Sequence, residues 1–128
     1  MSTARVPLAG TNLSILVGIL SRDPEVRRLP SGDAVVGLEL TVRHEGRPAE
    51  SVPVAWPMAP ERAASWAAGW AAGEELLVIG RVRRRFFRAG GATQSRTEVV
   101  AEAVVPTRRA AAARRALTAA VGSIAERL

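Results

Sequence analysis

The segment with the clearest capacity for binding chemistry is residues 81–88, which read Arg-Val-Arg-Arg-Arg-Phe-Phe-Arg. Alternate residues of a β-strand lie on the same face of the strand. One face of this segment therefore carries three guanidinium groups and an aromatic ring, from Arg81, Arg83, Arg85 and Phe87. Guanidinium groups can follow phosphates, and a flat ring can stack on an unpaired base. This combination favours binding of single-stranded nucleic acid over the alternative of a charged, solvated strand that only discourages aggregation.

The other face of the same segment is expected to be the core side. It carries four apolar residues, Leu76, Val78, Val82 and Phe86. Arg84 falls on this face too and is expected to reach solvent near one end of the domain. This register makes Phe86 a core residue and Phe87 a residue of the binding face.

Three further arginines are candidates for the binding surface. Arg88 and Arg96 flank residues 89–95, which contain two adjacent glycines and are expected to form a hairpin loop. Arg43 ends an alternating strand on its polar face. All three could contact phosphates as the strand-borne arginines do.

The distribution of charge points to the same region. All eighteen basic residues are arginine, and the formal net charge is +6. Residues 1–64 hold seven arginines and seven acids, whereas residues 65–128 hold eleven arginines and five acids. The excess favours a polyanionic partner, although an anionic surface or an acidic protein would suit it as well.

Several other chemistries lack the residues they require. The chain has no cysteine, and His44 is its only histidine, so thiol chemistry, disulfides and multi-histidine metal sites are excluded. No carboxylate pair or phosphate loop can be assembled, because Asp23 and Asp33 flank a turn and no helix follows the glycines at 90–91. The sequence predicts a non-enzymatic protein without a metal or cofactor.

The longest apolar run, residues 13–20, is too short to span a bilayer and is interrupted by Ser14 and Gly18. No signal-peptide core follows Met1. We therefore expect a cytoplasmic protein that does not bind membranes.

The spacing of apolar residues changes along the chain between that typical of strands and that typical of helices, and it predicts the order of the elements. Alternation predicts five strands, at residues 12–21, 34–43, 51–56, 75–88 and 96–105. A helical period over 60–72 places a short helix between the third and fourth strands, with Trp66 and Trp70 on its packing face. Residues 22–33 are rich in turn formers and are expected to be a connector. The order is that of the five-stranded oligonucleotide-binding (OB) barrel, a mainly β fold.

The chain is expected to divide into an N-terminal arm (1–11), an OB-fold domain (12–106) and a C-terminal amphipathic helix (107–128) capped by Thr107. The helix carries a narrow apolar stripe, formed by Leu117, Val121, Ile124 and Leu128. We expect the stripe to dock on the chain's own domain or on a sister subunit. The alternatives are a protein partner, or arginines of the helix laid on DNA or another anionic surface.

Several short motifs resemble those of the bacterial single-stranded DNA-binding proteins. In the first half these are Ile15-Leu16-Val17-Gly18, Leu20, Asp23-Pro24-Glu25-Val26-Arg27, Pro30-Ser31-Gly32 and Ala34-Val35. In the second half they are Gly73, Val78, Gly80-Arg81-Val82 and Thr97-Glu98-Val99-Val100. The resemblance covers residues 12–105 and implies a five-stranded barrel that binds single-stranded DNA non-specifically in replication, recombination or repair. It also implies a homo-oligomer, a tetramer or a dimer.

By position, the resemblance implies that Phe87 and Trp56 stack on bases and that residues 89–95 embrace the strand. The role of Trp56 stays open at this point. Its ring shares a strand face with Val52 and Val54, which have the character of core residues, so burial is the alternative.

The chain also departs from the family. The loop between the second and third strands is shorter, family aromatic residues are missing there, and a basic helix stands where the family has a flexible acidic tail. The alternative interpretation is an OB-fold protein-interaction module with weak or vestigial nucleic-acid binding, which the arginine row opposes. RNA satisfies the same stacking chemistry as DNA.

Overall fold

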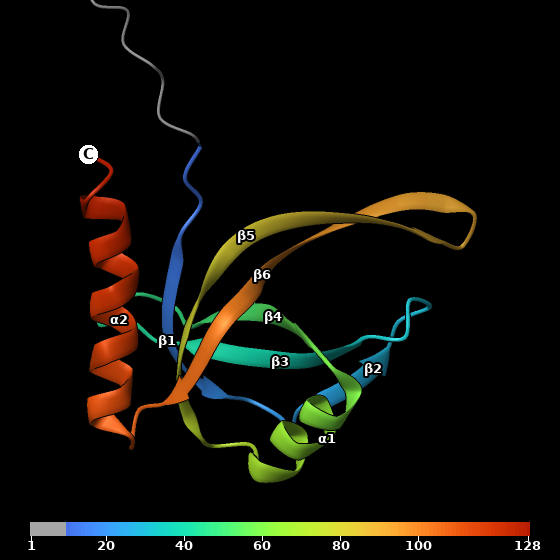
Figure 1. Ribbon diagram of the computed structural model, residues 1–128. Helices are drawn as coiled ribbons and strands as arrows, with labels where there is room; N and C mark the ends of the chain where they lie inside the picture. The colour runs from blue at the N-terminus through green and yellow to red at the C-terminus, as the bar shows by residue number, and fades with distance from the viewer. Residues whose placement is uncertain (1–9) are drawn as a thin grey trace, which may run out of the picture.

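A computed structural model describes residues 10–128 and shows a mainly β chain with six strands and two helices (Figure 1). The elements in order are β1 (Ser14–Leu20), β2 (Glu25–Arg28), β3 (Ala34–Val42), β4 (Glu50–Met58), α1 (Pro60–Gly69), β5 (Glu75–Ala89), β6 (Ala92–Pro106) and α2 (Ala110–Ala125). The mainly β class and the position of the short helix agree with the sequence-based expectation. Most of the predicted N-terminal arm, residues 1–9, lies outside the described residues.

All six strands belong to one sheet, in the order β1-β5-β6-β4-β3-β2. A further pairing between β1 and β3, at Ile19↔Thr41 and Leu20↔Leu40, joins the first strand of this series to the fifth. The pairings β1–β5–β6–β4–β3 therefore return to β1, and β2 is attached outside this closed series. Each pairing is antiparallel except β4–β6, which is parallel.

Strand β2 corrects the prediction that residues 22–33 are only a connector. Glu25–Arg28 pairs with the start of β3 through a tight turn in which Gly32 has φ 95°. All four side chains of β2 are exposed. The strand is held by backbone pairing and buries no face, so it leaves no alternation of apolar residues for the sequence to reveal.

The core follows the alternation of β3. Val36, Leu38 and Leu40 are buried, while the residues between them are only half-buried. The helix α1 covers one end of the sheet (Figure 1) and is shorter than the predicted helix over 60–72. Trp66 on α1 and Trp70, the residue directly after it, both contact the core, as predicted.

Trp56 is a member of this core. Its side chain is 8% exposed, and its ring stacks on that of Trp70, with centroids 5.8 Å apart and an interplanar angle of 8°. The ring of Trp66 packs against Trp56 at 5.3 Å. Of the two alternatives for Trp56, the structure shows burial. The ring is not available to stack on a base, because α1 covers it.

The hairpin formed by β5 and β6 is longer than predicted and extends away from the core (Figure 1). The strands run to a two-residue turn at Gly90-Gly91, whose φ angles of 58° and 79° suit a tight hairpin turn. Most of the loop predicted at residues 89–95 is therefore strand. The prediction that Phe86 is a core residue is wrong: its side chain is 66% exposed. Alternation sets the face on which Phe86 lies, but the core does not extend under this part of the hairpin.

The base of the hairpin contains an irregularity in β6. Ile79 pairs with Ala103, whereas Gly80 pairs with Ala101, so Glu102 is an extra residue in β6. The two backbones come so close here that a Cβ atom at Gly80 would lie 2.1 Å from the carbonyl oxygen of Val100. Only glycine fits at this position.

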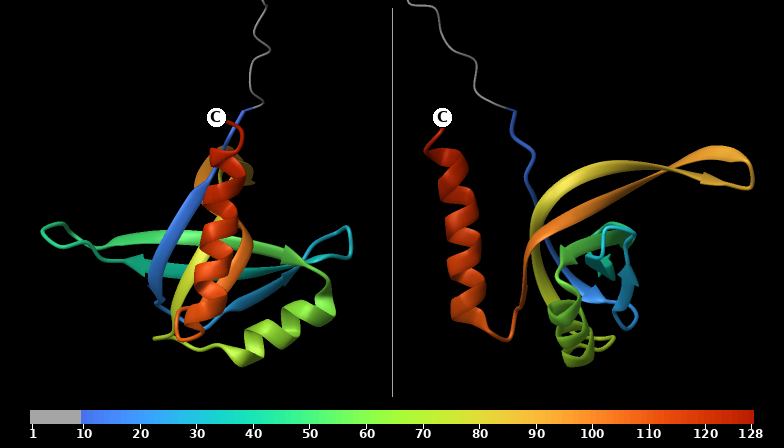
Figure 2. Two further views of the ribbon diagram at one scale, coloured as in Figure 1. Left: turned by 60° about the vertical axis from the view of Figure 1, so that its left-hand side comes forward. Right: turned by 45° about the vertical axis from the view of Figure 1, so that its right-hand side comes forward.

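Helix α2 stands on the side of the molecule opposite the hairpin tip (Figure 2). It begins at Ala110 with Arg109 as the N-cap residue, so the predicted cap at Thr107 is wrong. The Thr107 hydroxyl donates to Glu75 instead. No residue of α2 is buried, and the stripe residues Leu117 and Val121 are 37% and 50% exposed. Leu128 is exposed too, and only Ile124 of the stripe is half-buried, so the domain of its own chain leaves most of the stripe uncovered. Within residues 10–128, neither helix has the length and apolar character needed to cross a bilayer.

Candidate nucleic-acid interface

The predicted arginine row lies on β5, and each of its members contacts an acid on β6. Arg83 and Glu98 are directly opposed in the ladder, and Arg83 Nη2 donates to Glu98 Oε1 at 3.2 Å. Arg81 Nη1 lies 3.9 Å from an oxygen of Glu102. These pairs were not predicted from the sequence. The cross-strand partner of a residue depends on how the two strands are aligned, and the sequence of each strand alone does not determine that alignment. The exposed pair of Arg81 and Glu102 contributes only about 0–1 kcal/mol, so a phosphate could replace Glu102 as the partner of Arg81. Glu98 is buried, and loss of its arginine partners would leave a buried charge uncompensated.

Arg85 is held by two different contacts. Its Nε lies 3.1 Å from Glu98 Oε1, but the geometry is not that of a hydrogen bond, and this buried nitrogen has no hydrogen-bond partner within residues 10–128. Its Cζ lies 5.4 Å from the centroid of the Phe87 ring, within the range of a cation–π contact. Arg85 and Phe87 therefore share one face of the strand, as the alternation predicted, and the ring is half-buried.

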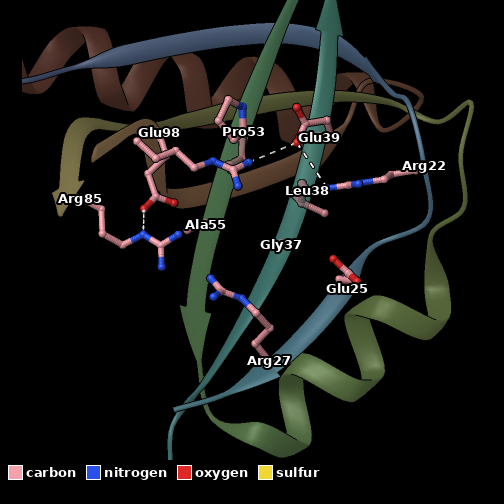
Figure 3. Close-up of a pocket in the computed structure, with 12 residues that line it drawn as sticks. Arg22, Glu25, Arg27, Gly37, Leu38, Glu39, Pro53, Ala55, Arg85 and Glu98 are labelled. Atoms are coloured by element: carbon pink, nitrogen blue, oxygen red, sulfur yellow. Dashed lines mark ion pairs between the residues drawn. The ribbon is translucent and has the colours of Figure 1, made fainter. Parts of the chain in front are cut away.

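A hollow of about 180 Å³ opens between this hairpin and β2, β3 and β4 (Figure 3). Its lining contains four arginines and three glutamates, namely Arg22, Arg27, Arg85, Arg96, Glu25, Glu39 and Glu98. Gly37 and Ala55, which pair across β3 and β4, form part of its floor. In Figure 3, Arg27 and Arg85 reach towards this floor from different sides.

Glu39 links three elements at the edge of the hollow. Its Oε2 lies 3.6 Å from a guanidinium nitrogen of Arg22 and 3.6 Å from one of Arg96, and its Oε1 accepts a hydrogen bond from Ser51 Oγ at 2.7 Å. These contacts bring Arg96, a predicted binding residue, beside Arg22, which the sequence did not indicate. Arg22 and Arg27 were missed because their segment has the composition of a turn, and only the pairing of β2 with β3 turns it towards the site.

Two other predicted residues lie apart from the hollow. Arg43 lines a second, larger depression of about 560 Å³ together with residues of β1, including Val17 and Ile19. Arg88 lies close to the hairpin turn, where its Nη2 donates to the carbonyl oxygen of Gly91 at 3.2 Å. The structure therefore assembles Arg81, Arg83, Arg85, Phe87 and Arg96 on one hairpin, and separates Arg43 from them.

No group of three or more histidine, aspartate or glutamate side chains within residues 10–128 is arranged to hold a metal ion. The chemistry of the interface is that of guanidinium groups, carboxylates and one aromatic ring. It can provide ion pairs, hydrogen bonds and stacking.

The single six-stranded sheet, the helix at its end and the arginine-rich hairpin define a small β protein with a basic binding surface. Residues 11–107 match the sequence model of the single-strand binding protein family, and the chain belongs to that family. Membership implies an OB fold and confirms the resemblance found in the sequence motifs.

A similar protein is the "Single-stranded DNA-binding protein" of Thermus aquaticus, which is 41% identical over 73 residues. The match covers 56% of this chain and 28% of the relative, so the region shared with this chain is little more than a quarter of the relative's length.

Proposed function

We propose that the protein binds single-stranded DNA without strong dependence on sequence, through a five-stranded OB barrel formed by residues 12–106. The observation that carries the proposal is the arrangement of Arg85 over Phe87 on a hairpin whose exposed arginines continue to Arg81. Guanidinium groups bind phosphates, and every base offers a π-face to a ring, so this surface accepts strands of any sequence.

The β5–β6 hairpin is the main contact in this proposal. Arg81 can exchange its exposed partner Glu102 for a phosphate. The side chains of Arg83 and Arg85 are 45% and 33% exposed, so they can contact a phosphate while they stay paired with the buried Glu98. Arg88 and Arg96 extend the charged surface along the hairpin. Arg43 lies outside this path, and a strand would reach it only by continuing round the barrel.

The relative's name and the family support single-stranded DNA binding. We also propose that this binding serves DNA replication, recombination or repair. We further propose that the functional unit is a homo-oligomer, a dimer or a tetramer. Helix α2 would then contribute its apolar stripe to a sister subunit or to a protein partner, because that stripe is exposed in the single chain.

The competing function is an OB-fold protein-interaction module. It is favoured by one observation: Arg81, Arg83 and Arg85 are already paired with acids of the same chain, which reduces their attraction for a polyanion. The two functions predict different affinities for a short, unstructured oligonucleotide: tight binding for the DNA-binding protein, and weak or no binding for the protein-interaction module.

The experiment that tests the proposal is a titration of fluorescently labelled oligo-dT, followed by anisotropy, with a duplex of the same length as the control. We expect saturable binding to the single strand that is much tighter than binding to the duplex. A labelled strand is the better probe, because the three tryptophans pack on one another and their fluorescence would report on the core. Equal affinity for the duplex, or no binding to oligo-dT, would favour the protein-interaction module.

A further inference from the structure

The hollow beside the hairpin has a lining of mixed charge. Four arginines stand among three glutamates, so the lining is nearly neutral overall. A site built only for phosphate would gain nothing from carboxylates, which repel it. A ligand that presents hydrogen-bond donors and acceptors side by side fits this lining better. The edge of a nucleobase is such a ligand.

Glu98 is the central acceptor of the hollow. Its side chain is 5% exposed, and both of its arginine contacts go to Oε1. Among the described residues, none donates a hydrogen bond to Oε2. Oε2 is not among the described buried side-chain atoms that lack a hydrogen-bond partner, so this oxygen is accessible to solvent and can accept a hydrogen bond from a ligand.

The donors stand next to this acceptor. Arg85 contacts Glu98 without a hydrogen bond from Nε, so few directional bonds fix the orientation of its guanidinium group. Arg27 reaches the same floor from β2 (Figure 3). Within residues 10–128, Arg27 forms no ion pair with an acid. The floor itself is low because Gly37 and Ala55 have small side chains. A planar group can therefore lie on the floor between the two guanidinium groups.

Among the four bases, guanine matches this arrangement best. Its N1–H and N2 amino group are adjacent donors for one carboxylate, and its O6 and N7 are adjacent acceptors for one guanidinium group. Adenine, cytosine and thymine each present fewer donors to a carboxylate. We infer that the hollow is a guanine subsite, in which Glu98 accepts from the N1 and N2 edge and an arginine donates to O6 and N7.

This subsite rests on the proposed function and adds a base preference to it. A strand held by phosphate contacts and stacking along the hairpin would place one base at a time in the hollow. Binding would remain possible for every sequence, and strands that contain guanine would bind more tightly.

The test uses the unaltered protein and labelled oligo-dT strands of one length that carry a single central substitution. The substituents are guanine, hypoxanthine (which lacks the N2 amino group), 7-deazaguanine (which lacks N7) and adenine. One guanine per strand prevents quadruplex formation. We expect the guanine strand to bind about five- to tenfold more tightly than oligo-dT, the lower part of the discrimination a bidentate base contact provides. Hypoxanthine and 7-deazaguanine should each lose most of that gain.

A second measurement uses Glu98→Gln, with Glu102→Gln as the matched control outside the hollow. Glu98→Gln should bring the ratio of guanine to thymine affinity close to one. Its affinity for oligo-dT should rise, because Arg83 and Arg85 lose the negative charge that competes with phosphate. Glu102→Gln should keep the ratio.

A variant that fills part of the hollow without changing its charge tests whether the shape of the hollow matters. A Cβ atom at Gly37 would meet Glu25 at ordinary contact distances of 3.6 and 4.0 Å, so Gly37→Ala is compatible with the fold and narrows the floor. It should lower the ratio of guanine to thymine affinity towards one.

Equal affinity for guanine and thymine strands in the unaltered protein would overturn the subsite while leaving the proposed function intact. Equal affinity for guanine and hypoxanthine strands would overturn the role of Glu98. If no oligonucleotide binds at all, both the subsite and the proposed function fail.

Discussion

The guanidinium group of Arg85 lies over the ring of Phe87, with 5.4 Å between Cζ and the ring centroid. The same arginine touches Glu98 through Nε. The Arg85 side chain thus connects the Phe87 ring to the hollow. A change at Phe87 or at Glu98 therefore alters the position of the Arg85 guanidinium group. Replacing the ring is therefore the most direct probe of this part of the surface.

Phe87→Ala should weaken binding to oligo-dT by about 1–3 kcal/mol, the usual value of one stacking contact. Phe86→Ala is the matched control on the adjacent position. Because Phe86 is 66% exposed, its removal should change the free energy of unfolding by no more than about 0.5 kcal/mol. Anisotropy titrations and urea melts measure the two effects. If Phe86→Ala weakened binding more than Phe87→Ala, the strand would run along the opposite face of the hairpin.

Binding should decrease as salt rises, because each phosphate contact releases counterions. For single strands the slope of log K against log salt is about −0.7 per phosphate neutralised. The double substitution Arg83→Ala with Arg85→Ala should reduce the slope by about one to two such units. Arg114→Ala with Arg115→Ala on α2 is the control and should leave the slope unchanged. A larger effect from the α2 pair would identify that helix as the DNA contact.

Alanine substitutions at two glycines should change the free energy of unfolding in opposite directions. Gly80→Ala places a Cβ atom 2.1 Å from the Val100 carbonyl oxygen, so the strands must separate, and we expect a loss of about 1–3 kcal/mol or more. At Gly122 in α2, an added Cβ atom would meet no neighbouring atom within 4 Å, so Gly122→Ala should stabilise the helix by up to about 1 kcal/mol. Denaturant unfolding measures both. A neutral Gly80→Ala would mean that the close approach of β5 and β6 is relieved at little cost.

The apolar stripe of α2 should be needed for assembly and not for binding of the strand. Leu117→Glu with Val121→Glu should lower the mass found by light scattering, because charges on the stripe prevent its burial against another subunit. Thr118→Glu with Ala119→Glu adds the same charge at exposed positions beside the stripe and should leave the mass unchanged. Loss of oligo-dT binding at unchanged mass would instead make α2 an arm that contacts the strand.

The sequence allowed prediction of those elements that bury one face. Val36, Leu38 and Leu40 alternate because β3 packs on a core, and that strand was placed to within a residue. The four exposed residues of β2 give no such signal. Alternation likewise assigned Phe86 to the face of Val78, but it cannot tell how far the core extends beneath that face.

The sequence allowed prediction of those features of the candidate site that depend on a single strand. Features that depend on the pairing of two strands could not be predicted. The shared face of Arg85 and Phe87 follows from alternation alone. The carboxylate of Glu98 between two arginines follows from the register of β5 against β6, and the approach of Arg22 to Glu39 follows from the closure of the sheet. Trp56 shows the same limit, since its burial depends on where α1 packs.

The extra residue at Glu102 has a consequence for the arginine substitutions on the hairpin. A bulge increases the local twist of a strand and bends it, and this one lies where the hairpin leaves the core and arches over β3 and β4 (Figure 1). The arch is therefore a property of the backbone at Gly80 and Glu102, and the charged side chains farther along the hairpin do not create it. When Arg83 or Arg85 is replaced, the hairpin should keep its path, and the change in affinity will report the missing guanidinium group and its contacts with Glu98 and Phe87.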